Sequence, residues 1–175
     1  MKQKITFFAL ISMLVLVFAC NTKPTTDEAL AYDDKIIHEQ GAIQDSFNAF
    51  EETLLTYVPE EMEAALADAL AQTEKSLKIL KECEEFDKKT ELRDAAIDFA
   101  EMYKDLAENE YVALVANYSL PDSLYSEEVE ENCNLLLTSI DEKYTKVFDK
   151  MAKAQQDFAD AYGFEINKKT EDIEE

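Results

Sequence analysis

The feature that most limits the fold of this chain is the scarcity of glycine and proline, with two and three copies in 175 residues. Tight turns between strands depend on these residue types, so a fold rich in β-strands is disfavoured. Because 47% of the residues are hydrophobic, the chain can nevertheless bury a core. The composition therefore predicts an all-α protein built from a few long helices.

Start signals and apolar spacing predict the first two helices. Thr25 and Glu28 have the spacing of a capping box, and Pro59 followed by Glu60 and Glu61 is typical of a helix start. The apolar face of the first helix comprises Ile36, Ile43, Phe47, Phe50, Leu54 and Tyr57. That of the second comprises Met62, Leu66, Ala69, Thr73, Leu77, Leu80 and Cys83.

A change of phase predicts a third helix. Continuing the second apolar face beyond Leu80 would bury five carboxylates, which is untenable. The apolar positions instead resume at Leu92, Ala96, Phe99, Tyr103 and Leu106. We therefore expect a tight connection around residues 87–90, with one continuous helix over residues 59–117 as the alternative. The third helix is expected to end near Tyr118.

The fourth helix has the most regular pattern, with four-three spacing over ten positions. These are Val129, Cys133, Leu136, Ile140, Tyr144, Val147, Met151, Ala154, Phe158 and Ala161. We expect Ser123 or Ser126 to cap its start and Gly163 its end. Because short connections make neighbouring helices antiparallel, residues 27–163 should form an antiparallel up-down-up-down four-helix bundle. Residues 164–175 are expected to be an acidic tail, although Phe164 and Ile166 could fold back.

The N-terminal sequence predicts that the protein is located in the cell envelope. Lys2 and Lys4 precede an apolar run that is too short to span a membrane comfortably, so residues 1–19 are expected to be a signal peptide. The ending Leu16-Val17-Phe18-Ala19-Cys20 resembles a bacterial lipobox, which implies lipidation of Cys20 and a tether over residues 20–26. An ordinary cleaved signal with a chance cysteine is the alternative. By resemblance to sorting signals, Asn21 favours the outer membrane, facing the periplasm or the cell surface.

Three segments together resemble the small helical lipoproteins of the Bacteroidota envelope. They are the lipobox, the segment from Tyr32 to Ile37, and the stretch from Gln155 to Phe164. The resemblance implies a lipid-anchored helical bundle, and it brings no catalytic residue with it.

Residue types argue against catalysis and against several classes of ligand. A formal charge of −22 disfavours nucleic acid, because binding to phosphates needs a basic surface. His38 is the only histidine, and the chain has neither the Glu-x-x-His pairs of di-iron bundles nor a nucleophile motif. We therefore expect no enzyme activity, no cofactor and no metal site.

Cys83 and Cys133 are expected to be buried free thiols, since the helix order separates them by roughly 30 Å.

Charge and tyrosines point to an interaction surface at one end of the bundle. Residues 36–74 contain nine acidic side chains, residues 105–142 contain ten, and neither stretch has a Lys or Arg. Both should lie in the half away from the membrane. Tyr57, Tyr118 and Tyr125 should meet there with Leu120 and Leu124, either as a recognition surface or as a cover over the core. The candidate surface comprises Tyr57, Glu60, Glu61, Tyr118, Tyr125, Glu127 and Glu128.

These features predict a lipid-anchored, non-enzymatic cell-envelope protein that acts as a binding or spacer module. Besides the membrane, its expected partner is a cationic protein or divalent ions, and the chain is expected to be monomeric. The alternative is a carrier of a ligand or divalent cation that uses the bundle interior or the acidic membrane-distal end.

Overall fold

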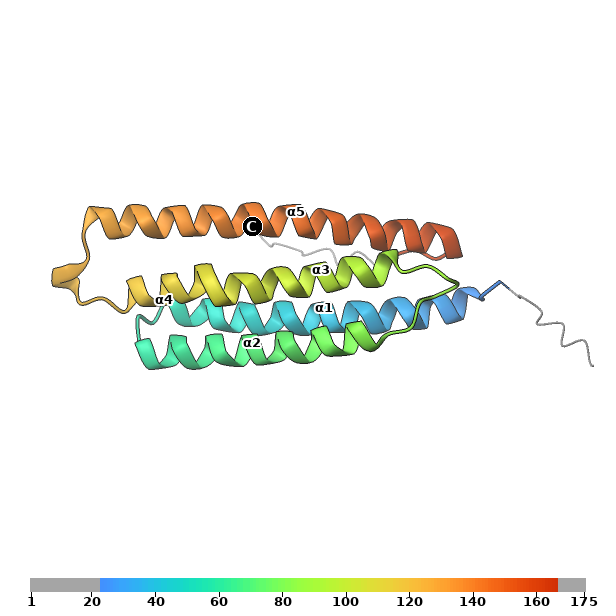
Figure 1. The fold of residues 1–175 in the computed structure, drawn as a ribbon, viewed down its shortest axis with the longest axis horizontal. Coiled ribbons are helices and arrows are strands. Elements are labelled where there is room, and N and C mark those ends of the chain that lie inside the picture. Colours follow the sequence, from blue (N-terminus) through green and yellow to red (C-terminus); the bar gives the residue numbers. More distant parts are fainter. Residues whose placement is uncertain (1–22, 167–175) are drawn as a thin grey trace, which may run out of the picture.

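The computed structural model of the chain describes residues 23–166, whose regular elements are all helices, as the composition predicts. The helices are α1 (Thr26–Leu54), α2 (Pro59–Glu82), α3 (Glu91–Leu106), α4 (Val112–Tyr118) and α5 (Glu127–Tyr162). A π-helical segment (Ala107–Tyr111) joins α3 to α4, and a 3₁₀ turn (Asp122–Leu124) precedes α5. Figure 1 shows α1, α2, α5 and the continuous rod of α3 and α4 side by side.

Two expectations fall outside this range. The signal peptide with Cys20, and the acidic tail from residue 167 onward, lie beyond the described residues. Within residues 23–166 there is no β-strand, and no helix there is both long and apolar enough to cross a bilayer.

The helix ends carry the capping residues that the sequence predicts. Thr25 and Glu28 form a complete capping box at the start of α1, and Pro59 occupies the first turn of α2. The Ser126 hydroxyl accepts a hydrogen bond from a backbone N–H in the first turn of α5. Gly163 ends α5 with φ 75°, a left-handed conformation that glycine adopts without a steric cost.

The two ends of the molecule are defined by contacts between helix termini. At one end the Thr26 hydroxyl donates a hydrogen bond of 2.8 Å to the Tyr162 carbonyl, which joins the start of α1 to the end of α5. At the other end the rings of Tyr57 and Tyr118 lie 5.7 Å apart. We call the first end proximal, because α1 begins there, and the second end distal.

The core is built from the apolar faces that the spacing predicts. Phe47 and Phe50 of α1 are fully buried, and the Phe47 ring lies 4.5 Å from Tyr103 and 5.5 Å from Tyr111. The other large, fully buried apolar side chains are Ile36, Ile43, Met62, Leu80, Phe99, Leu106, Leu114 and Met151. Tyr57, expected at the end of the α1 face, is instead 62% exposed.

The connection between α2 and α3 covers residues 83–90 and begins earlier than expected. Phe86 and Lys89 exchange two backbone hydrogen bonds of 3.0 and 2.9 Å across Asp87 and Lys88. Both central residues have positive φ, 50° and 62°, as a type I′ turn requires. The alternative of one continuous helix over residues 59–117 is therefore wrong, because the chain reverses here rather than bury its carboxylates.

An aromatic cluster covers the proximal end of the core. The Phe158 ring lies 5.4 Å from Phe86, 4.8 Å from Tyr162 and 5.7 Å from Tyr32. Phe164 also packs on Phe158, with ring centres 6.1 Å apart. The chain thus continues to contact the bundle after Gly163, as the fold-back of Phe164 anticipates.

The π-helical segment was not predicted, and it resolves a conflict of spacing. Leu106 and Tyr111 are both buried although they are five positions apart, and an α-helix places its core positions three or four apart. One π turn restores the phase, and it also buries Glu110. Burial raises the pKa of Glu110, but hydrogen bonds from Lys143 and Ser139 outweigh that effect and hold the pKa below its usual value.

Helix α5 packs along α3 and contacts α1 much less (Figure 1). As a result its predicted apolar face is unevenly buried: Cys133, Met151 and Phe158 are inside, whereas several other members are only half-buried. The seam with α1 is polar, because Gln44 donates to the Tyr144 hydroxyl and Gln155 donates to Asp33.

Asp33 in this seam makes stability depend on pH. The carboxylate is buried, and Oδ1 has no hydrogen-bond partner within the described residues. Burial raises the pKa of Asp33 above its ordinary value of 3.8, the hydrogen bond from Gln155 opposes this rise, and Asp34 adds to it. The folded state therefore keeps this proton to higher pH than the unfolded state, and stability falls as pH rises from about 3.8 through the raised folded-state pKa.

We expect Asp33→Asn to raise the free energy of unfolding at pH 7, because a neutral amide costs less to bury than an ionised carboxylate. The gain should shrink toward pH 4, where Asp33 itself becomes neutral. Urea unfolding at several pH values measures this, with Asp45→Asn at an exposed position of the same helix as the control. A gain that is independent of pH would show that the charge of Asp33 is not its cause.

Candidate functional site

Exposed apolar side chains gather at the distal end. Nine large hydrophobic residues are exposed among the described residues. Five of the nine lie in the α1–α2 turn or in the loop before α5: Leu55, Tyr57, Val58, Leu124 and Tyr125. Leu55 is 78% and Leu124 61% exposed, so these side chains do not cover the core. Exposed large apolar side chains concentrated at one end of a molecule favour a binding surface there.

The α1–α2 turn holds Tyr57 in an unfavourable backbone conformation. Its φ is 55°, a left-handed value that costs a residue with a bulky side chain roughly 1–2 kcal/mol. The turn is held by the Thr56 hydroxyl, which accepts from the Val58 N–H at 3.2 Å and donates to the Thr53 carbonyl at 2.8 Å. The result is an aromatic side chain directed into solvent beside Tyr118.

The loop between α4 and α5 supplies the second half of this surface. Pro121 and the 3₁₀ turn after it bring Tyr125 back toward α5, where the Tyr125 hydroxyl lies 4.0 Å from Cys133 Sγ. Tyr57, Tyr118 and Tyr125 then line one open depression of about 650 Å³. Burial raises the pKa of Tyr118 above its usual value, so this phenol stays neutral and can donate a hydrogen bond at physiological pH.

Carboxylates lie at the starts of the two helices that follow the distal connections. Glu60 and Glu61 lie in the first turn of α2, and Glu127 and Glu128 lie in the first turn of α5. All four are exposed, and none belongs to an ion pair formed within residues 23–166. The N-terminus of a helix favours negative side chains, which accounts for the position of these four glutamates. No cationic side chain of residues 23–166 pairs with them.

The structure thus brings together the residues predicted for an interaction surface. Tyr57, Tyr118 and Tyr125 line one depression, and the four glutamates lie in the first turns of the two helices that follow the distal connections. Of the two readings left open by the sequence, a cover over the core does not fit, because Tyr57 and Tyr125 are 62% and 41% exposed. The aromatic cover lies at the opposite end, around Phe158.

Two members of the surface were missed from the sequence. Leu55 lies outside the apolar face of α1, and Val58 immediately precedes the proline that begins α2. Two apolar residues off the predicted face, on either side of an exposed tyrosine, were the signal available. Cys20, the predicted lipidation site, lies outside the described residues.

The cysteines, the histidine and the clustered carboxylates form no further site that the structure describes in residues 23–166 as a metal centre. No group of three or more His, Cys, Asp and Glu side chains there is arranged to hold a metal ion. Cys83 and Cys133 are buried free thiols, as predicted, and His38 is exposed.

No family model matches the chain, and neither a curated protein nor a solved structure matches it significantly. Its function must therefore be inferred from its own residues and their arrangement.

Proposed function

We propose that this protein is a non-enzymatic, lipid-anchored envelope protein whose distal end binds a cationic partner that also presents apolar side chains. The observation that carries the proposal is the concentration of five exposed large apolar residues among unpaired carboxylates at one end of the molecule. Apolar contact supplies affinity, while the negative charge selects a basic partner and speeds its approach.

The charge distribution supports the same choice of partner. The two stretches without Lys or Arg, residues 36–74 and 105–142, include both distal connections. Of the four lysines that border them, Lys104 pairs with Glu74 and Lys143 with Asp105, toward the middle of the rods. The other two, Lys35 and Lys75, lie in the interior of α1 and α2, away from the turn that joins these helices. No cation of the described chain is therefore placed to neutralise the distal surface, and a basic partner would do so.

The proposed anchor would direct this surface away from the membrane. Five residues separate Cys20 from α1, and they span at most about 18 Å when extended. Helix α5 has 36 residues, which corresponds to a length of about 54 Å. We propose that the helices form an antiparallel up-down-up-down bundle, which the short connections and the contacts at both ends support. The binding end would then project far from the lipid.

Site-specific photocrosslinking in intact cells tests this function. A benzophenone side chain at Leu124 should give a defined adduct, whereas the same group at Val112 should not. Val112 is a matched control because it is also apolar and exposed, by 52%, and lies in the same acidic half but away from the distal end. The adduct should weaken at least severalfold when Glu127 and Glu128 are both replaced by Lys.

Chelation separates this function from divalent-ion binding. A protein partner held by direct charge contacts should give the same adduct with and without a chelator. Equal adducts at Leu124 and Val112, or an adduct that survives the charge reversal unchanged, would refute the proposed binding end.

A further inference from the structure

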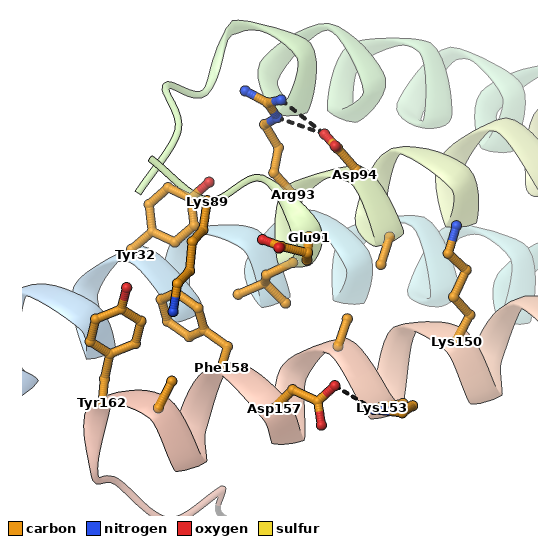
Figure 2. A pocket seen from close by; sticks show the side chains of 14 residues that line it. Tyr32, Lys89, Glu91, Arg93, Asp94, Lys150, Lys153, Asp157, Phe158 and Tyr162 are labelled. Atoms are coloured by element: carbon orange, nitrogen blue, oxygen red, sulfur yellow. Dashed lines mark hydrogen bonds and ion pairs between the residues drawn. The ribbon is translucent and has the colours of Figure 1, made fainter. Parts of the chain in front are cut away.

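A second surface feature lies at the proximal end, between α3 and α5. Figure 2 shows a cavity bounded by Tyr32, the start of α3 and the last turns of α5. Its volume is about 510 Å³, within the range of roughly 300–1,000 Å³ that small-molecule pockets occupy. The proposed distal function does not use this cavity.

The walls of the cavity are mostly apolar, and small side chains create its space. Ala95 of α3 and Ala154 and Ala161 of α5 all line the cavity, and we call the space beside these small side chains the slot. Leu92 and Phe158 complete the walls and are buried. An apolar space between two helices suits a hydrocarbon chain better than a bulky polar molecule.

The cationic side chains at the rim of the cavity differ in whether they already belong to an ion pair. Arg93 is paired with Asp94, and Lys153 with Asp157, as the dashed lines in Figure 2 mark. Lys150 is likewise paired with Asp98.

Lys89 is different, because it belongs to no ion pair within residues 23–166. Its ammonium group lies 5.4 Å from the centre of the Tyr162 ring. Figure 2 shows Lys89 reaching down toward the rings of Tyr162 and Phe158, at the aromatic end of the slot. The type I′ turn fixes the backbone of Lys89 through its two hydrogen bonds with Phe86. Lys23 adds a second cation there, since its ammonium lies 5.8 Å from the same Tyr162 ring.

We propose that this cavity binds an anionic amphiphile, with one hydrocarbon chain in the alanine-lined slot and a carboxylate or phosphate head group at Lys89. Charge complementarity selects the head group, because four cations and three carboxylates line the cavity. Lys89 is the cation, and Glu91 the carboxylate, that belongs to no ion pair within residues 23–166, so the anionic head group is placed at Lys89. The apolar walls select the chain. The ligand class follows from this cavity alone and does not depend on lipidation of Cys20.

Calorimetric titration of the folded protein with soluble probes below their micelle concentration tests the assignment. Dodecanoate and dodecyl phosphate should bind, and dodecyltrimethylammonium, which has the same chain and the opposite charge, should bind at least about tenfold more weakly. Shortening the chain should weaken binding by about fourfold per methylene group. Equal binding of the cationic and anionic probes would overturn the proposal.

Paired variants locate the binding site. Ala154→Phe should fill the slot and reduce dodecanoate affinity more than tenfold, whereas Ala152→Phe, at an exposed position of α5 outside the cavity, should not. Ala161→Phe provides an independent filling variant at an exposed lining position, so a folding defect of Ala154→Phe leaves the test intact. Lys89→Gln should weaken dodecanoate by about threefold to fivefold, and Lys88→Gln should not.

The natural source of the amphiphile is distinguished by competition. Vesicles of phosphatidylglycerol that displace dodecanoate would identify a bilayer lipid as the source, and failure to displace it would identify a free fatty acid or lysolipid. Binding to vesicles with no binding of the soluble probes, or full binding by both filling variants, would show that the cavity is not the site.

Discussion

Replacing Phe47 by alanine is expected to lower the free energy of unfolding by about 3–5 kcal/mol. Phe47 is 1% exposed, and its ring contacts Phe50, Tyr103 and Tyr111, which come from α1, α3 and the π-helical segment. Truncation removes the transfer free energy of a whole ring and leaves a cavity between rigid elements, where neighbours are unable to close in fully. Urea unfolding followed by circular dichroism measures the loss.

Phe148→Ala is the matched control, because it removes the same ring from an exposed position. Phe148 is 37% exposed and stacks on Tyr144 with ring centres 5.4 Å apart. Its loss should cost about 1 kcal/mol or less. If the two variants were destabilised equally, the aromatic centre at Phe47 would not be the core of the fold.

Local signals predicted the helices well. Capping at Thr25 and Ser126, the start at Pro59 and the end at Gly163 each depend on a few neighbouring residues, which the sequence displays directly. The buried faces of α1 and α2 followed for the same reason, since apolar spacing needs only the helical period.

Features that depend on contacts between distant segments were harder to predict. Asp87 and Lys88 adopt positive φ although neither is glycine or asparagine, so the turn between α2 and α3 lacks a local signature. The π-helical segment had one signal, the five-residue step from Leu106 to Tyr111, which a helical period of 3.6 does not accommodate. The loose packing between α1 and α5 had no sequence signal, because it depends on how α5 packs against α3.

The distal surface was predicted in part, and the proximal cavity was not. Tyr57, Tyr118 and Tyr125 could be placed together from the helix order, but their exposure could not, since it depends on the backbone of the turn at Tyr57. The proximal cavity combines single residues from α1, the α2–α3 connection, α3 and α5. Lys89 and Ala154 belong to no motif in the sequence, and it is the fold that places both at the same cavity.

The central claim is that the molecule is held at its N-terminus by lipid and presents its distal end outward. Cys20→Ser should therefore produce the largest change expected of any single substitution. Without the cysteine no acyl chain can be attached. Each CH₂ group buried in the bilayer contributes roughly 0.8 kcal/mol to membrane binding, so losing the acyl chains removes essentially all membrane affinity. The helical bundle itself should be unaffected, because Cys20 precedes α1 and its capping box.

The most direct measurement is the distribution of the protein between the membrane and soluble fractions of cells that produce either form. The wild-type protein should be recovered with the membranes, and Cys20→Ser should move into the soluble fraction with its helicity and melting temperature unchanged. Cys83→Ala, which removes a buried thiol outside the lipobox, should stay with the membranes. Retention of Cys20→Ser in the membrane fraction to the same extent as wild type would contradict the account.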